Sequence, residues 1–373
     1  MVPFIGRPGA AIPFALLISS ACPPAFAQSS VTLYGSLDAG VAYVNNRDGH
    51  SQVAMLQGVA QPDRFGLTGT EALGGGWSAV FRLENGFFTN NGALARANTL
   101  FSRQAYVGLS STRYGTLTLG EQSSFNYDWV APLGNNFQGN NLLAAHPGNL
   151  DGLVETTSAQ EANLIKYRSA VWNGLSFGLL YGLGGVAGDF SNGRIAGGAA
   201  SYTNGPLAIA AAYVNEHNRA LGPMLGDTTA GLGLSTFQGK PALSYVADKI
   251  ENIGVGARYD FGRLRLHAVF TYVRIVSGSF ADSYRTWETG ATWLGTPANA
   301  IVGGIAATGF IGRRYLTATL GDVYSLSKST QVYLQAVAQQ ATGTTDARAS
   351  IFSVGASSTP RQLAFVTGIH HLF

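Results

Sequence analysis

The feature that most constrains this chain is a two-residue hydrophobic repeat that recurs in segments of about ten residues. In 331–339, for example, Val332 and Leu334 alternate with Gln331 and Gln335. Such a repeat is typical of a β-strand whose two faces meet different surroundings. No segment sustains the 3.6-residue period of an amphipathic helix. The longest apolar run in residues 28–373 covers only 207–214, which is too short to cross a bilayer as a helix.

Sixteen segments with this repeat follow one another along the chain, and most are separated by short and long connections in alternation. The segments lie at about 31–44, 62–71, 76–88, 101–111, 115–123, 161–170, 174–184, 192–202, 206–215, 251–261, 263–275, 283–294, 298–309, 312–326, 330–341 and 361–373. The longer connections are 45–61, 89–100, 124–160, 216–250 and 342–360. Short turns at one end of the strands and long loops at the other are typical of an up-and-down membrane barrel, whereas a Greek-key sandwich has no reason to separate them.

The composition supports the same fold. Charged residues make up 12% of the chain, about half the roughly 25% of a soluble globular domain. Lipid offers no hydrogen bonds, so a spanning backbone must pair its polar groups within a helix or a closed barrel. We therefore predict an all-β fold, a transmembrane antiparallel up-and-down β-barrel of about sixteen strands with short periplasmic turns and long extracellular loops. A barrel of that size encloses a water-filled channel.

The N-terminal segment has the features of a secretory signal. Arg7 provides a positive start, 10–18 are apolar, and Ala25-Phe26-Ala27 is a small-x-small cleavage site. We expect residues 1–27 to be removed after Ala27, so that the mature chain starts at Gln28 and is exported through the general secretory route. A lipoprotein signal ending at Cys22 is the alternative.

Other function classes find little support. The net charge of +3 and the absence of Lys/Arg clusters argue against a nucleic-acid partner. Gly174-Leu175-Ser176-Phe177-Gly178 fits a nucleophile-elbow pattern, but it opens a strand, whereas the motif needs a strand–turn–helix context. The histidines have no ligand-like spacing, and the predicted mature chain has no cysteine. We expect no enzyme activity, no cofactor and no metal site.

Several stretches resemble the general porins of Gram-negative outer membranes, in particular their β-proteobacterial branch, and the resemblance covers 28–373. The stretches are Val31-Thr32-Leu33-Tyr34-Gly35, Arg64-Phe65-Gly66-Leu67-Thr68-Gly69-Thr70-Glu71, Arg103-Gln104-Ala105-Tyr106-Val107-Gly108-Leu109, Ile165-Lys166-Tyr167-Arg168-Ser169, Leu326-Ser327-Lys328-Ser329-Thr330 and Gly368-Ile369-His370-His371-Leu372-Phe373. The resemblance implies a homotrimer in outer-membrane lipid and lipopolysaccharide, passive diffusion, and a third extracellular loop folded into the pore. It also implies that Phe373 is read by the barrel-insertion machinery.

The resemblance directs attention to the third long loop and to basic residues on the wall. We expect 124–160 to constrict the pore, although 216–250 is also long enough. The candidate lumen bases are Arg64, Arg82, Arg103, Lys166 and Arg168, and the candidate opposing acid is Asp128.

The orientation of Arg103 needs a separate argument. The two-residue period places it with Ala105 and Val107. An arginine facing mid-bilayer lipid would cost about 2–4 kcal/mol. We therefore expect this face to point inward and Tyr106 outward.

Five wall bases set against few loop acids predict a weak preference for small hydrophilic anions among the solutes and ions that diffuse through. The alternative is a substrate-preferring channel for a nutrient such as an organic anion.

Overall fold

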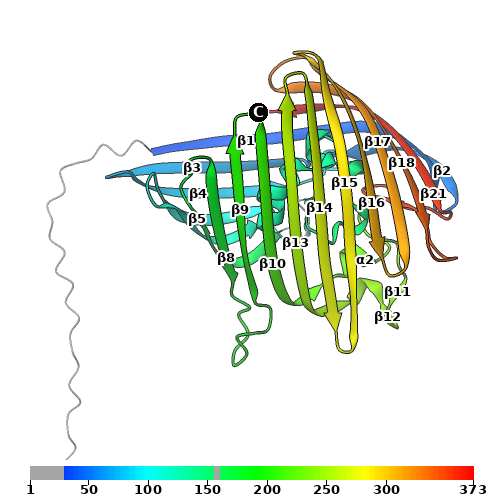
Figure 1. Ribbon diagram of the computed structural model, residues 1–373, viewed down its shortest axis with the longest axis horizontal. Coiled ribbons are helices and arrows are strands. Elements are labelled where there is room, and N and C mark those ends of the chain that lie inside the picture. The colour runs from blue at the N-terminus through cyan, green and yellow to red at the C-terminus, as the bar shows by residue number, and fades with distance from the viewer. Residues whose placement is uncertain (1–28, 155–159) are drawn as a thin grey trace, which may run out of the picture.

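The computed structural model describes residues 29–154 and 160–373, and the predicted signal segment with its cleavage site between Ala27 and Gln28 lies outside them. Seventeen strands of the described chain form one antiparallel sheet that curves into a barrel (Figure 1). The strands are β1 Ser29–Arg47, β2 His50–Gln57, β3 Arg64–Gly74, β4 Trp77–Gly86, β5 Gln104–Ser111, β6 Gly115–Ser123, β7 Gln160–Arg168, β8 Leu175–Gly182, β9 Ile195–Asn204, β10 Leu207–Ala220, β13 Val246–Phe261, β14 Leu264–Ser277, β15 Phe280–Thr296, β16 Asn299–Phe310, β17 Arg313–Ser325, β18 Thr330–Thr342 and β21 Arg361–Leu372.

The shorter elements all lie in the connections. They are η1 Asn126–Val130, η2 Ala131–Leu133, α1 Asn135–Gln138, η3 Leu142–Ala144, η4 Pro147–Asn149, α2 Gly222–Leu225, β11 Thr236–Phe237, β12 Lys240–Pro241, η5 Ala242–Ser244, β19 Ser350–Ile351 and β20 Gly355–Ala356. None of the described helices is long and apolar enough to span a membrane.

The barrel closes at β1. One edge of β1 pairs with β21, in the register Leu37↔His371. The other edge pairs with β3 through residues 29–36 and with β2 through residues 39–47. Because β2 and β3 pair with different parts of the same edge of β1, they share one position in the ring. The seventeen strands therefore fill sixteen positions, as predicted. The last residue completes the closure, since Phe373 and Gly35 exchange backbone hydrogen bonds of 2.9 and 3.2 Å.

The prediction that 45–61 is a loop is wrong, because most of this segment forms the β1–β2 hairpin. Asp48 and Gly49 turn the chain with φ of 49° and 95°, which is the Asp-Gly signal of a tight hairpin. The chain then bends over 58–63 before β3. Asp38 holds this bend by accepting hydrogen bonds from the backbone amides of Val59, at 2.6 Å, and Ala60, at 3.2 Å.

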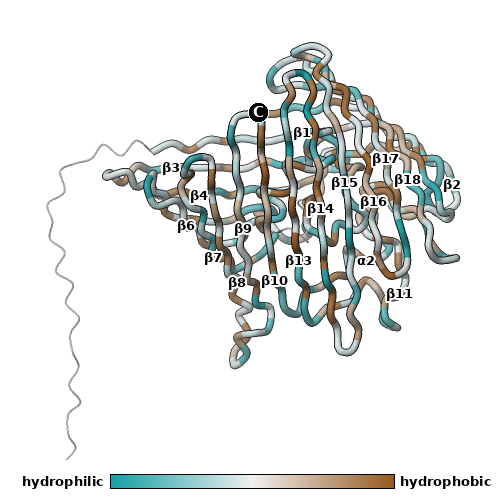
Figure 2. Tube along the Cα trace, viewed as in Figure 1, coloured by the Kyte–Doolittle hydropathy of each residue, from teal (hydrophilic) through white to brown (hydrophobic). Residues whose placement is uncertain are grey.

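The two faces of the wall have opposite character. Large apolar side chains are exposed on the outer face, and Figure 2 shows hydrophobic residues recurring along the strands. Examples are Val107, Leu109, Leu117, Leu119, Leu179, Ile305, Leu316, Leu320 and Leu334. Cross-strand partners share a face, as Val107 does with Leu119. An apolar outer band and a polar interior are what a barrel needs in lipid.

The predicted faces of β5 are wrong. Val107 is 60% exposed on the outer face, and Tyr106 pairs with Arg82, so Tyr106 points into the lumen. Arg103 still reaches the lumen because it precedes the strand. The first residue of the strand, Gln104, is the register partner of Glu84. The backbone amide of Arg103 donates to the Glu84 carbonyl at 3.1 Å. The alternation therefore starts at Gln104, and Arg103 does not obey it.

The wall is higher on one side than on the other. Strands β3–β8 have 8–11 residues, whereas β10 and β13–β18 have 12–17. In Figure 1 the β8–β9 loop and the β14–β15 hairpin lie at one rim and the C-terminus at the other. Connections 278–279 and 311–312 are tight, as the spacing of the segments indicates.

The corrected faces of β5 can be tested with one substitution at adjacent positions. We expect Val107→Glu to lower the free energy of unfolding by roughly 2 kcal/mol, because it exposes a carboxyl group to mid-bilayer lipid. Tyr106→Glu, which faces water and lies beside Arg82, should cost less than half as much. Urea unfolding in lipid vesicles measures both. A larger cost for Tyr106→Glu would reverse the face assignment.

Candidate functional site

The connection between β6 and β7 folds into the barrel as far as the structure describes it, over 124–154. Its contacts run from one wall to the other. Asn135 Nδ2 donates to the Ile305 carbonyl of β16 at 3.3 Å, and Gln335 Nε2 of β18 donates to the Asn140 carbonyl at 2.7 Å. The Leu142 amide donates to the Val59 carbonyl at 2.6 Å, which joins the loop to the bend between β2 and β3. Figure 1 shows its short helices enclosed by the strands.

Glycines on the lumen face make room for this inserted loop. A Cβ atom at Gly178 would overlap the ring of Phe125. At Gly304 it would overlap the side chain of Asn135, and at Gly256 it would press on Leu133. Alanine or larger residues at these positions would push the loop away from the wall. The lumen-facing glycines of the strands thus mark the positions at which the inserted loop packs against the wall.

The other long connection, 216–250, does not cross the lumen as the inserted loop does. Over 221–245 it packs against the lumen face of the high wall near the rim, in a cluster that joins Leu225 and Phe237 to Ile275, Tyr284 and Phe310. It contacts the inserted loop, where Gly148 lies against Met224 and Leu232 and where Leu150 joins the same cluster. The segment covers the rim, and 124–154 crosses the lumen.

Two of the predicted bases converge on an acid that the sequence analysis did not name as a candidate, and a third lies beside a tyrosine bound to the same acid. Glu84 of β4 accepts hydrogen bonds from Arg103 Nε at 2.7 Å and from Tyr34 Oη at 2.6 Å. Arg64 Nε lies 3.8 Å from its carboxylate. Arg82 lies over the Tyr34 ring, 5.5 Å from its centroid. Glu84 shares the lumen face with Arg82, so the alternation of β4 contained this signal.

The other predicted residues form a second cluster. Asp128 accepts from Lys166 Nζ at 2.5 Å and from Arg168 Nη2 at 2.7 Å. Lys166 is buried and also donates to the Ser123 carbonyl at 2.6 Å. Acid and bases lie side by side here, rather than facing each other across an open passage. Because one carboxylate compensates one of the two cations, the cluster acts on a passing ion with a single net positive charge.

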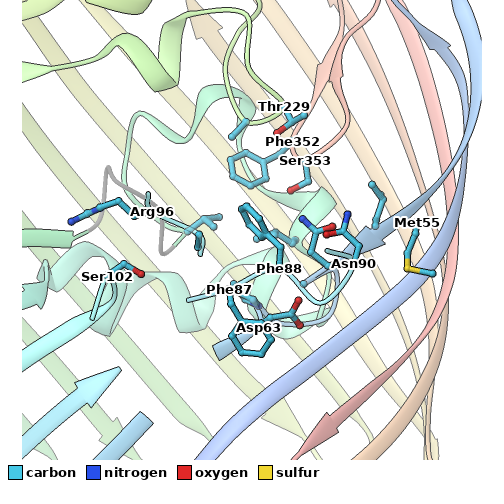
Figure 3. Close-up of a pocket in the computed structure, with 18 of the residues that line it drawn as sticks. Met55, Asp63, Phe87, Phe88, Asn90, Arg96, Ser102, Thr229, Phe352 and Ser353 are labelled. Carbon is cyan, nitrogen blue, oxygen red and sulfur yellow. The ribbon is translucent and has the colours of Figure 1, made fainter. Parts of the chain in front are cut away.

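Two neighbouring cavities border the inserted loop. The larger has a volume of about 450 Å³ and the smaller about 160 Å³, and Pro62, Leu142 and Val154 line both. Arg64 lines the smaller cavity opposite Tyr127 and Phe137 of the inserted loop. Figure 3 shows the larger cavity, where residues of several loops surround a common space.

The lining of these cavities is positively charged. The described lining residues include the arginines Arg47, Arg64, Arg96 and Arg103, and a single acid, Asp63. Asp63 accepts hydrogen bonds from the backbone amides of Asp38 at 2.6 Å and Thr89 at 2.9 Å. Burial raises the pKa of the Asp63 carboxyl, which these hydrogen bonds counteract. The acid is committed to the backbone of the bend, so the field in the passage depends on the arginines and on the carboxylates of Glu84 and Glu121 that pair with three of them.

A buried histidine fastens the inserted loop to the high wall. His146 Nδ1 lies 2.6 Å from Asp151 Oδ2, and His146 Nε2 lies 3.1 Å from Glu288 Oε2 of β15. Thr271 of β14 donates to the same Asp151 oxygen at 2.7 Å. Burial alone would lower the pKa of His146, but the carboxylates of Asp151 and Glu288 raise it to about 10. The sequence analysis missed this cluster because its members are far apart along the chain.

A closed barrel with long loops on one rim and a loop folded into a charged lumen defines an outer-membrane channel protein. The model of the Gram-negative porin family matches residues 14–344, and the chain belongs to this family. It is 31% identical to outer membrane porin protein 32 of Delftia acidovorans, over 96% of this chain and 98% of that protein. It is 28% identical to an outer membrane porin protein of Bordetella pertussis, over 91% of this chain and 88% of that protein.

Solved structures share the fold. The anion-selective porin from Comamonas acidovorans superposes with a TM-score of 0.73 at 24% identity, over 93% of this chain and all of that one. Salmonella typhi OmpF, in complex with daunomycin, superposes with a TM-score of 0.62 at 18% identity, over 92% of this chain and 97% of that one.

The His146 cluster predicts how stability depends on pH. A raised histidine pKa contributes stability that is complete below the ordinary value of 6.5 and is lost as the pH rises through about 10. Below pH 6.5 we expect His146→Gln to unfold more easily than the native protein by about 3–5 kcal/mol, since it leaves two buried carboxylates without their cation. The difference should disappear by about pH 10.

Urea unfolding in detergent micelles at several pH values measures this difference. The exposed His50 provides the matched control, because His50→Gln removes a histidine that has no buried carboxylate partner in the described chain. A stability difference for His146→Gln that does not change with pH would contradict the ion cluster.

Proposed function

We propose that this porin is a water-filled channel for passive diffusion of small hydrophilic solutes and ions, with a weak preference for anions. The observation that carries the anion preference is the positive charge left after pairing around the two cavities: Arg47 has no ion-pair partner in the described chain, and Arg64 and Arg103 share the single carboxylate of Glu84, whereas Asp63 is bound to backbone amides. The structural relative named as an anion-selective porin supports the same direction. Fixed positive charge in a narrow passage attracts anions and repels cations.

The loop 124–160 is proposed to constrict the channel, with Arg64 at the narrow part of the passage opposite the inserted loop. Arg82 and Arg103 lie behind it around Glu84. Lys166 and Arg168 contribute less than the sequence suggested, because Asp128 neutralises part of their charge. The field of the constriction is therefore assigned mainly to the arginines of the β3–β5 wall and the residues next to it.

A substrate-preferring channel is the second candidate function. The larger cavity favours it, because Phe87, Phe88 and Phe352 contribute to its lining. Apolar rings are unexpected in the lumen of a channel that serves only hydrated ions.

The proposal includes how the protein reaches its place. Residues 1–27 direct export through the general secretory route and are cleaved between Ala27 and Gln28. Phe373, which pairs with Gly35 at the closing strands, serves as the signal for the barrel-insertion machinery. The mature chain assembles as a homotrimer in outer-membrane lipid and lipopolysaccharide. It acts without a cofactor or metal and catalyses no reaction.

Reversal potentials in planar bilayers under a potassium chloride gradient test the selectivity. The native channel should favour chloride. Arg64→Gln should shift the reversal potential toward potassium, because it removes positive charge from the passage. Asp128→Asn should shift it toward chloride, because Lys166 and Arg168 lose their counter-charge.

Swelling of liposomes with sugars of increasing size measures diffusion without charge and is the control for channel formation. A native channel that prefers potassium would contradict the anion preference. Equal shifts of the reversal potential in the same direction for both variants would contradict the assigned roles of the two residues.

A further inference from the structure

We propose that the larger cavity is a binding site for small aromatic carboxylates, in which one arginine binds the carboxylate and phenylalanines contact the ring. This inference rests on the proposed channel function, because it places the site on the path of the solute. The cavity lies on the side of the long loops, and residues from the β4–β5, β10–β13 and β18–β21 connections and from the inserted loop line it. A solute entering from that side meets it before the narrow part at Arg64.

The first observation is the apolar character of this lining. Phe87 and Phe88 come from the connection after β4, Phe352 from the connection after β18, and Leu142 and Val154 from the inserted loop. Figure 3 shows Phe87, Phe88 and Phe352 grouped around the same space, although they come from distant parts of the chain. The volume of about 450 Å³ lies within the range of about 300–1,000 Å³ for sites that hold small molecules.

The second observation is a cation without a counter-charge. Arg47 lines the cavity, and its Nη1 donates to the neutral Gln52 Oε1 at 3.2 Å. No carboxylate of residues 29–154 and 160–373 forms an ion pair with it. Arg96, by contrast, pairs with Glu121 at 2.7 Å, and in Figure 3 its side chain extends away from the phenylalanines. A guanidinium group binds a carboxylate with two parallel hydrogen bonds.

The third observation excludes the opposite charge. Asp63 is the only acid among the described lining residues. Its two oxygens accept from the backbone amides of Asp38 and Thr89, so it is already engaged. Among the described lining residues, an aromatic amine would find rings but no available carboxylate, and it would meet the repulsion of Arg47. A small aliphatic anion would find Arg47 alone. Only a molecule with both an apolar ring and a carboxylate uses both parts of the site.

Benzoate is the probe that tests the site. Native full-length channels are inserted into planar bilayers, and benzoate, acetate or benzamide is added on the side of the long loops. We expect benzoate to reduce the chloride current saturably, because a bound molecule occupies the path. Acetate lacks the ring and benzamide lacks the charge, so neither should reduce the current at the same concentrations.

Two variants and one control locate the effect. Arg47→Gln should raise the half-maximal benzoate concentration about ten-fold, the factor expected for losing a charged hydrogen bond. Phe88→Ser should raise it as well, because it removes a ring from the site. Arg263→Gln removes the same charge from the exposed turn between β13 and β14, which does not line the cavity, and should leave the benzoate effect unchanged. The unitary conductance of each variant without benzoate verifies that the barrel is intact.

The outcomes separate the site from the channel. Native channels that conduct but show no saturable benzoate effect, or the same effect with acetate, would overturn the binding site and leave the proposed function in place. An unchanged half-maximal concentration in Arg47→Gln would also overturn it. A native protein that forms no channels would overturn the proposed function and, with it, the role of this site.

Discussion

The pairing of β1 with strands on both of its edges is the constraint on which the rest of the structure depends. In hydrocarbon an unpaired backbone amide or carbonyl costs several kcal/mol, so a sheet with free edges cannot exist there. β1 removes both edges at once, because it pairs with β21 on one side and with β3 and β2 on the other. Once the ring is closed, the two-residue repeat of every strand is divided between lipid and water. The lumen, its charges and the space for the inserted loop all follow from that division.

The inserted loop fills part of the lumen, whereas in a small barrel the side chains of the wall fill the interior. A ring of sixteen strands is too wide to be filled by its own side chains, so the chain itself fills part of the lumen. Glycines such as Gly178 and Gly304 leave room on the wall, and polar groups on the high wall hold the loop in place. His146, between Asp151 and Glu288, is one of these attachments. A buried carboxylate is costly unless it is paired with a cation and hydrogen-bonded, and here His146 lies between the two carboxylates while Thr271 donates to the same Asp151 oxygen.

The strands could be predicted from the sequence because their signal is local and repeated, whereas the contacts between them depend on register. The repeat located most of the strands of the ring, and it failed where the pattern is interrupted. The repeat predicts a loop where the β1–β2 hairpin lies, although Asp48-Gly49 is a turn signal, because β2 is short and followed by a bend. It predicts reversed faces for β5 because Arg103 fits the alternation but lies just before the strand. The grouping of Arg64, Arg103 and Tyr34 around Glu84 joins three strands and a loop end, which no spacing along the chain reveals.

The charges of the lumen show why counting bases is a poor guide to selectivity. Lys166 and Arg168 look equivalent to Arg64 in the sequence, but they share the carboxylate of Asp128 at hydrogen-bond distance, so the group carries one net positive charge instead of two. The sequence gives no reason to single out Arg47, which lies at the end of a strand next to a turn, and yet this arginine has no acidic partner in the described chain. An ion in the passage responds to the charge that is left after local pairing, since the field of a close pair falls off within a few ångströms. The residues that set the preference of this channel are therefore the bases in excess after pairing: Arg47, and the arginines Arg64, Arg82 and Arg103 around the single carboxylate of Glu84. That condition is a property of the folded wall and not of the composition.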